Sequence, residues 1–170
     1  MFELFGNMDS AEEINKTAAG LKAEGDIENI KKLATENGIQ EEIAEMFING
    51  EIPWITDEMM AAIGKIQVEE DDLKPEEIMK DWTEYLKARC MEEPKIAVAV
   101  RKKSKSLKGC MGKLLKWSHE NMKPVDSEIM KAAGFTGSVK LGIPGMGRAK
   151  KIITEYYLSE SEVNDEKEST

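Results

Sequence analysis

The sequence has no apolar stretch long enough to cross a membrane. Its longest uninterrupted apolar run is Ile96 to Val100, whereas a bilayer-spanning helix needs roughly 20 such residues. The segment from Met1 to Gly6 has no basic stretch ahead of an apolar core and no small-residue cleavage site. We therefore expect no signal peptide and a cytoplasmic protein.

Cysteine and histidine are also scarce. The chain has 2 cysteines, Cys90 and Cys110, and 1 histidine, His119. Without an export signal, both cysteines are expected to be reduced thiols. Neither a CxxC nor an HxxxH spacing is present to pre-position zinc ligands. His119 lies roughly 13 Å from Cys110 along one predicted helix, so the two cannot form a catalytic pair within it.

Motifs of the common enzyme classes are missing too. The sequence contains no Walker phosphate loop, no GxSxG nucleophile elbow and no kinase signature set. No carboxylate lies within an otherwise apolar helical face, where burial would raise its pKa and prepare it for acid-base catalysis. The sequence therefore argues against an enzyme and implies neither a metal nor another cofactor.

Charge is abundant and unevenly distributed. The 170 residues are 41% hydrophobic and 34% charged, which is typical of a folded domain, and the net charge is −9. Residues 1–100 carry −14, residues 101–154 carry +10 and residues 155–170 carry −5. Such asymmetry indicates a basic surface for a polyanion, or an acidic surface for a basic partner. Alternatively, the two parts dock on each other or keep the protein soluble.

Apolar residues recur at helical spacing along most of the chain, between capping residues and glycines. Ser10 to Glu13 form a capping box, in which the Ser10 hydroxyl accepts from the third helical amide and Glu13 bonds the amide of the cap. The five-residue run at Ile96 could be a strand, but no second convincing strand exists to pair with it, so we predict a helix. The predicted helices cover residues 11–24, 27–37, 40–49, 57–68, 75–90, 96–100, 107–122, 126–133 and 148–157.

These patterns predict an all-α protein made of a bundle of short helices. We expect an acidic helical domain over residues 1–92, a basic helical portion over 93–158 and a disordered acidic tail over 159–170. The acidic run at residues 69–72 is predicted to be a solvated linker. Gly109 and Gly112 weaken the helix that contains them, but permit close helix approach or backbone contact with a ligand.

One local pattern has a direct physical use. In the segment Leu141-Gly142-Ile143-Pro144-Gly145-Met146-Gly147, two glycines flank an apolar residue just before a helix. The free amides of a helix amino terminus favour a phosphate. The segment resembles the turn of the helix-hairpin-helix family, which grips a nucleic-acid backbone without reading sequence. The resemblance implies that Gly145, Met146 and Gly147 form the hairpin and that Arg148, Lys150 and Lys151 supply cations.

Two features of that segment depart from the family. The family keeps a helix directly before the hairpin, whereas here the preceding predicted helix ends near Ala133. The spacing from the second glycine to the following alanine is also shorter. The alternative is a tight Pro-Gly turn that starts a core-packing helix.

A second resemblance involves the basic segment that starts at Arg101. The stretch Lys105-Ser106-Leu107-Lys108-Gly109-Cys110 resembles the Lys-Ser-Leu-x-Gly-Cys helix of the PcfK-like small proteins carried by conjugative elements, some of which are anti-CRISPR inhibitors of type II RNA-guided nucleases. The acidic, glycine-punctuated first half is similar in style to another group of such inhibitors from gut-bacterial mobile elements. The candidate partner-binding cations of this segment are Arg101, Lys102, Lys103, Lys105, Lys108 and Lys113.

The resemblance implies a non-catalytic inhibitor that binds a type II CRISPR nuclease with its guide RNA, in the cytoplasm of the bacterial host cell, and blocks DNA binding or cleavage. The acidic part could compete for a channel of the nuclease while the basic part contacts nucleic acid. The alternative is a DNA- or RNA-binding accessory protein of a mobile element, acting through the hairpin. A third hypothesis is an adaptor with no nucleic-acid role.

Overall fold

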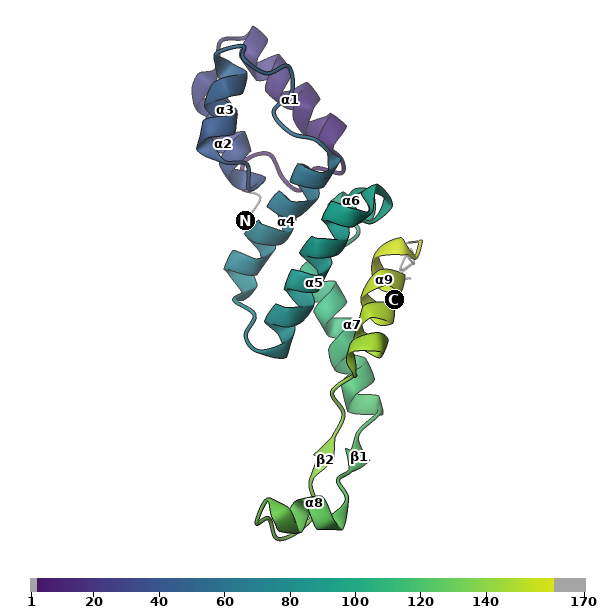
Figure 1. Cartoon of the computed structure of the whole chain (residues 1–170). Helices are drawn as coiled ribbons and strands as arrows, with labels where there is room; N and C mark the ends of the chain where they lie inside the picture. Colours follow the sequence, from purple (N-terminus) through teal and green to yellow (C-terminus); the bar gives the residue numbers. More distant parts are fainter. Residues whose placement is uncertain (1–2, 161–170) are drawn as a thin grey trace, which may run out of the picture.

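The computed structural model describes residues 3–160, and this part of the chain is mostly helical (Figure 1). The result confirms the predicted all-α class. The elements are α1 Ala11–Ala23, α2 Ile27–Glu36, α3 Glu41–Ile48, α4 Glu58–Leu73, α5 Ile78–Glu92, α6 Pro94–Arg101, α7 Leu107–Glu120, β1 Lys123–Pro124, α8 Ser127–Ala132, β2 Lys140–Leu141 and α9 Met146–Leu158. The expected tail lies, beyond Glu160, outside the described residues. No helix among residues 3–160 combines the length and apolar character needed to cross a membrane.

Short side chains start five of the helices by accepting a hydrogen bond from a first-turn amide. At α1 the Ser10 hydroxyl accepts from Glu13 N–H at 3.1 Å, as predicted. The Glu13 carboxylate, however, accepts from Asp9 N–H at 2.5 Å, one residue earlier than a capping box requires. The other caps of this kind are Asp26, Asp57, Ser106 and Asp126.

The first core joins α1, α2 and α3 at one end of the molecule (Figure 1). Its members include Ile14, Ile30, Leu33 and Phe47, which come from the apolar faces that the sequence pattern predicted. These helices are too short to be stable alone in water, so packing of their apolar faces supplies their stability. The first residues of α4 close this core through Ala61.

The second core contains the rest of α4 together with α5, α6, α7 and α9. Leu86 of α5, Ile96 of α6, Leu114 of α7 and Ile153 of α9 are all buried in it. The expected domain boundary at residues 92–93 falls between α5 and α6, and both of these helices contribute to the second core. The run at Ile96 is helical, as predicted.

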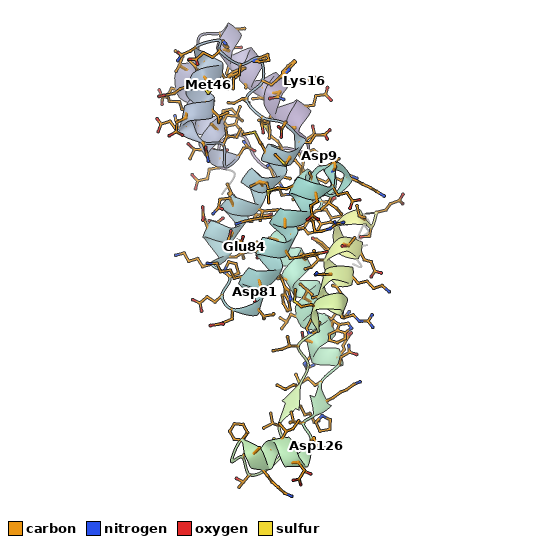
Figure 2. The ribbon with its side chains drawn as sticks, viewed as in Figure 1. Asp9, Lys16, Met46, Asp81, Glu84 and Asp126 are labelled. Carbon is orange, nitrogen blue, oxygen red and sulfur yellow. The ribbon has the colours of Figure 1, made fainter. Side chains whose placement is uncertain are left out.

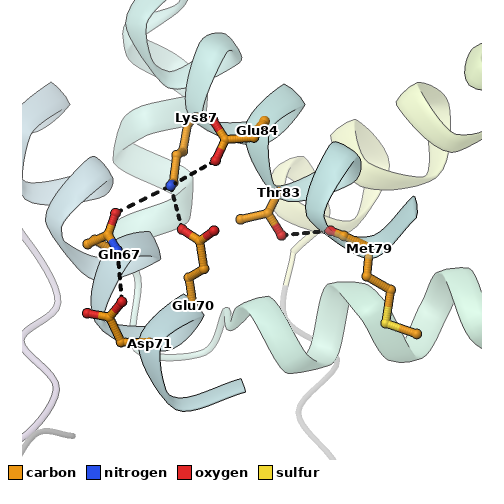
Figure 3. A network of polar contacts seen from close by, with 7 residues as sticks. All are labelled: Gln67, Glu70, Asp71, Met79, Thr83, Glu84 and Lys87. Atoms are coloured by element: carbon orange, nitrogen blue, oxygen red, sulfur yellow. Dashed lines mark hydrogen bonds and ion pairs between the residues drawn. The ribbon is translucent and has the colours of Figure 1, made fainter. Parts of the chain in front are cut away.

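The expectation of a linker at residues 69–72 is wrong, because α4 continues to Leu73. The acidic side chains of this run are used inside the fold. Lys87 of α5 donates to the carboxylates of Glu70 and Glu84 and to the Gln67 amide, and Gln67 in turn donates to Asp71 at 2.9 Å (Figure 3). This network joins α4 to α5. The start of α5 also differs, since the helix begins at Ile78 and not at the expected Pro75.

A narrow arm, residues 122–143, projects from the helices between α7 and α9 (Figure 1). Antiparallel strands β1 and β2 form its stem, with Lys123 opposite Leu141 and Pro124 opposite Lys140, and α8 lies at its tip. Val125 N–H donates to Val139 C=O at 2.9 Å and continues the ladder. At the base, a Cβ on Gly142 would lie 2.1 Å from Ser118 C=O, so only glycine fits there. The sequence pattern had not predicted this ribbon.

Candidate binding surfaces

Arg101, a predicted partner-binding cation, is buried and links the two cores. Only 1% of its surface is exposed. One guanidinium nitrogen donates to the Asn37 side chain at the end of α2, and another lies 3.5 Å from Ala61 C=O of α4. Burial lowers the pKa of Arg101 to about 10. Arg101 thus supports the fold, and we leave it out of the candidate surface.

Lys105, another predicted partner-binding cation, is buried as well. Its Nζ donates to Tyr156 C=O at 2.7 Å and to the Ser159 hydroxyl at 3.1 Å. These bonds place a cation at the carboxyl end of α9, where the helix dipole favours positive charge. Burial lowers the pKa of Lys105 below its ordinary value. Lys105 therefore fastens α9 to the loop between α6 and α7.

The loop between α6 and α7 is also bound by Lys65 of α4, a residue that the sequence pattern did not indicate. Lys65 is fully buried, and its Nζ donates to the carbonyls of Val100, Lys102 and Lys105 at 3.0, 2.8 and 2.7 Å. One turn further along α4, the buried Glu69 carboxylate accepts from Leu107 N–H at 3.0 Å. A lysine and a glutamate spaced one helical turn apart are the only local hint of this arrangement.

The remaining cations of the loop, Lys102 and Lys103, are exposed. Lys103 N–H donates to the Asp9 carboxylate at 2.8 Å, and its Nζ lies 3.7 Å from a Glu13 oxygen. The acidic and basic parts of the chain therefore meet at this point. Part of the positive charge of the loop faces carboxylates of the chain itself.

The Lys-Ser-Leu-x-Gly-Cys segment packs α7 against α9. Ser106 caps α7, while Leu107 and Cys110 are buried in the second core. Gly109 lies directly against Tyr156, and a Cβ at this position would be 2.2 Å from the Tyr156 hydroxyl oxygen. That hydroxyl also accepts from Ser106 N–H at 3.1 Å. In this segment Lys108 alone has an exposed side chain, so the residues that carry the resemblance serve packing.

Gly145, Met146 and Gly147 form the start of α9. Gly145 is the N-cap, with no side-chain capping bond, and Met146 and Gly147 are the first helical residues. Pro144 is buried beside them. Strand β2 precedes this turn, and α8 ends at Ala132. The turn therefore joins a strand to a helix, whereas the helix-hairpin-helix family joins two helices.

Six exposed cations remain on α7 and α9, and we call them the α7/α9 cations. The Arg148 guanidinium lies 5.8 Å from the centre of the Trp117 ring, and Lys150 Nζ lies 5.3 Å from that of Tyr85. Such contacts orient a cation without neutralising it. The set is Lys108, Lys113, Lys116, Arg148, Lys150 and Lys151.

The arm exposes several large apolar side chains. The exposed fractions are 61% for Ile129, 60% for Phe135, 60% for Leu141 and 62% for Ile143. Within residues 122–143 Met130 is the only buried side chain, so the arm has almost no core of its own. Asp126 lies in the arm, at the opposite end of the molecule from Lys16 and Met46 (Figure 2).

The two cysteines and the histidine that were considered for catalysis do not form a site. Cys90 and Cys110 are buried, and burial raises the pKa of each thiol to about 12, so neither is a thiolate at neutral pH. His119 is exposed on α7, on a different face from Cys110. Over residues 3–160, no group of at least 3 histidine, cysteine or acidic side chains is placed to hold a metal ion.

Comparisons of this chain with protein-family models, curated proteins and solved structures give no match.

Proposed function

We propose that this chain is a non-catalytic binding protein that inhibits a nucleic-acid-handling machine, with a guide-loaded type II RNA-guided nuclease as the first partner to test. The observation that carries the proposal is the arm, whose Ile129, Phe135 and Leu141 are exposed without a core beneath them. Exposed apolar groups concentrated on one element mark protein-binding sites. Covering each such side chain is worth roughly 1.5–3 kcal/mol.

The chemistry of the arm favours a protein partner over bare nucleic acid. Its three lysines, Lys123, Lys131 and Lys140, are accompanied by Asp126 and Glu128, and Lys131 pairs with Glu128 at 2.7 Å. Little uncompensated charge is left for phosphates, whereas Ile129, Phe135 and Leu141 are each at least 60% exposed. A projecting element of this kind fits a recess on a larger protein.

The nuclease is chosen as partner on the resemblance and on charge. RNA-guided nucleases hold nucleic acid in positively charged channels, and residues 1–100 of this chain carry a charge of −14. We infer that the acidic first part of the chain occupies such a channel while the apolar arm occupies an adjacent recess. Inhibition would then follow from steric exclusion of the DNA.

The test is a pull-down with guide-loaded nuclease, followed by a DNA cleavage assay. Replacing Ile129 and Phe135 by Asp should weaken binding and inhibition at least tenfold, because two charges would be buried without partners. The matched control replaces Thr136 and Ser138, two exposed polar residues of the same arm, by Asp. Binding of the control should stay within about twofold of the original. Failure of the unmodified protein to bind the nuclease removes this partner.

The α7/α9 cations favour a second candidate function, non-specific binding of DNA or RNA by an accessory protein of a mobile element. Three of them, Arg148, Lys150 and Lys151, adjoin the amino terminus of α9, where no side chain caps the first amides, so that these amides can donate to a phosphate. This candidate predicts binding to naked duplex DNA that weakens steeply with salt. Binding should be lost in the variant Gly147→Asp with Lys150→Glu.

The two candidates give opposite results on naked DNA. A protein that ignores duplex DNA at low salt but co-elutes with guide-loaded nuclease supports the inhibitor and removes the accessory function. A protein that binds duplex DNA with a steep salt dependence and ignores the nuclease does the reverse. If neither partner is bound, both candidates are wrong.

A further inference from the structure

Trp54 is an exposed aromatic side chain on the loop between α3 and α4. Its exposed fraction is 64%, while the next residue, Ile55, is fully buried in the first core. Asn15 of α1 fastens the two residues that follow Trp54. Its Oδ1 accepts from Ile55 N–H and Thr56 N–H, each at 3.2 Å, and its Nδ2 donates to Thr56 C=O at 3.0 Å. The backbone after Trp54 is therefore anchored to α1, while the indole lies in the solvent.

The indole borders a groove of about 520 Å³ between α1 and the start of α4. Small side chains of α1, Ala11 and Ala19, contribute to its lining. The charged groups around it are Glu12, Lys16, Asp57 and Glu58. Lys16 is paired with Glu12 at 2.8 Å, so the carboxylates of Asp57 and Glu58 determine the sign of the charge next to Trp54. We call this feature the Trp54 groove.

We propose that the Trp54 groove binds an arginine or lysine side chain from a basic protein segment. The aliphatic part of such a side chain would lie along the alanines and the indole face, while its charged head would reach the carboxylates. Charge complementarity selects this occupant. A nucleic-acid backbone would be repelled by the two carboxylates, and an apolar side chain would strip water from them without compensation.

This inference goes beyond the proposed function. The Trp54 groove lies on the end of the molecule that contains Lys16, opposite the arm with Asp126 (Figure 2). Neither the arm nor a nuclease is needed for the groove to bind a basic side chain. The proposed function and this inference can therefore fail separately.

The test follows the indole N–H signal of Trp54 by NMR while a capped hexa-arginine peptide is added to the full chain at low salt. The chain has 3 tryptophans, and the variant Trp54→Phe assigns the signal. We expect a saturable shift of the Trp54 signal, and of the Ala11 and Ala19 amides, that exceeds the shift of the other two indoles. Trp54→Ala should weaken the binding seen at those amides at least fivefold.

Variants that remove the two carboxylate charges test their role without disturbing the helix. Asp57 caps α4, and asparagine caps a helix as well as aspartate does, so Asp57→Asn combined with Glu58→Gln removes two charges and keeps the cap. This double variant should bind hexa-arginine at least fivefold more weakly. The matched control, Glu24→Gln with Glu42→Gln, removes two exposed charges away from the groove and should bind within about twofold of the original.

Three outcomes would overturn the inference. Equal weakening in the control variant would mean diffuse attraction to the acidic end. Tighter binding of a neutral capped glycine–leucine peptide would mean an apolar occupant. A Trp54 signal that does not move at millimolar hexa-arginine would mean that the groove is not a site. Circular dichroism of each variant establishes that the helices are retained.

Discussion

At the scale of single residues, buried ionisable groups of the second core have pKa values that burial has moved far from normal. The pKa of Cys90 and that of Cys110 rise from 9.0 to about 12, and the pKa of Lys65 falls from 10.5 to about 8. In each case the interior disfavours the charged form. The thiols and the lysine therefore have opposite effects on stability at alkaline pH.

We expect the free energy of unfolding to decrease between pH 9 and 12 because of the two thiols. Their folded-state pKa values are raised, so the unfolded chain releases the protons first, which costs about 1.4 kcal/mol per thiol per pH unit. Lys65 opposes this between pH 8 and 10.5, where the unfolded chain binds the extra proton. Above pH 10, Arg101 opposes the decrease in the same way because burial lowers its pKa to about 10, while the raised pKa of the buried Tyr157 adds to the decrease. The decrease should therefore steepen above about pH 10.5.

Urea unfolding under reducing conditions, repeated at intervals from pH 7 to 11, measures this dependence. The variant Cys90→Ala with Cys110→Ala should be less stable at neutral pH because of the cavities, but its stability should depend less on pH above 9. A double variant whose alkaline decrease is as steep as that of the original chain would contradict the assignment to the thiols.

At the scale of elements, the two glycines of α7 should respond oppositely to the same substitution. Gly109 lies against Tyr156, whereas nothing lies within 4 Å of a Cβ added at Gly112. Gly112→Ala should stabilise the protein by about 0.5–1 kcal/mol, through helix propensity. Gly109→Ala should destabilise it by about 1–3 kcal/mol, because it pushes α9 away from α7. Thermal unfolding of both variants is the measurement, and equal shifts would contradict the packing of α7 on α9.

Local signals predicted most helices well, because a cap and an apolar stripe act within one helix. Ser10 accepts the capping bond that the sequence indicated. Errors arose where distant residues decide the structure. The run at residues 69–72 reads as solvated, yet it lies within α4 because Glu69 bonds Leu107 and Glu70 bonds Lys87. The two-residue strands of the arm are too short for any alternation of polar and apolar residues to appear.

The candidate surfaces were harder to predict than the helices. Positive charge alone does not distinguish the buried Arg101 and Lys105 from the exposed Lys108. Their burial depends on acceptors from other helices, namely Asn37, Ala61 and Tyr156. The Trp54 groove has no local sequence pattern either, because it is assembled from α1, the loop at Trp54 and the start of α4.

At the scale of the whole molecule, the arm should be dispensable for folding. Lys123 and Leu141 are directly opposite each other, so replacing residues 124–140 by Asn-Gly would join them through a two-residue hairpin turn. With Met130 as the one buried side chain removed, the melting temperature should change by no more than roughly 5 °C. Circular dichroism on heating measures this, and loss of the folded helices would show that the arm is part of the core.

The same variant separates folding from binding. If the arm contacts the partner, the shortened protein should lose binding to guide-loaded nuclease while it keeps its response to hexa-arginine. Retained inhibition of cleavage would move the binding surface elsewhere on the molecule.

Helix α4 has a geometric consequence for any partner that binds both ends. Ala61 belongs to the first core and Ala62 to the second, so one uninterrupted helix passes between them. The Trp54 groove and the second core, from which the arm projects, are therefore joined by a continuous helix and not by a linker. A partner that engages both ends at once therefore needs a basic segment for the Trp54 groove and an apolar recess for the arm, separated by a matching distance.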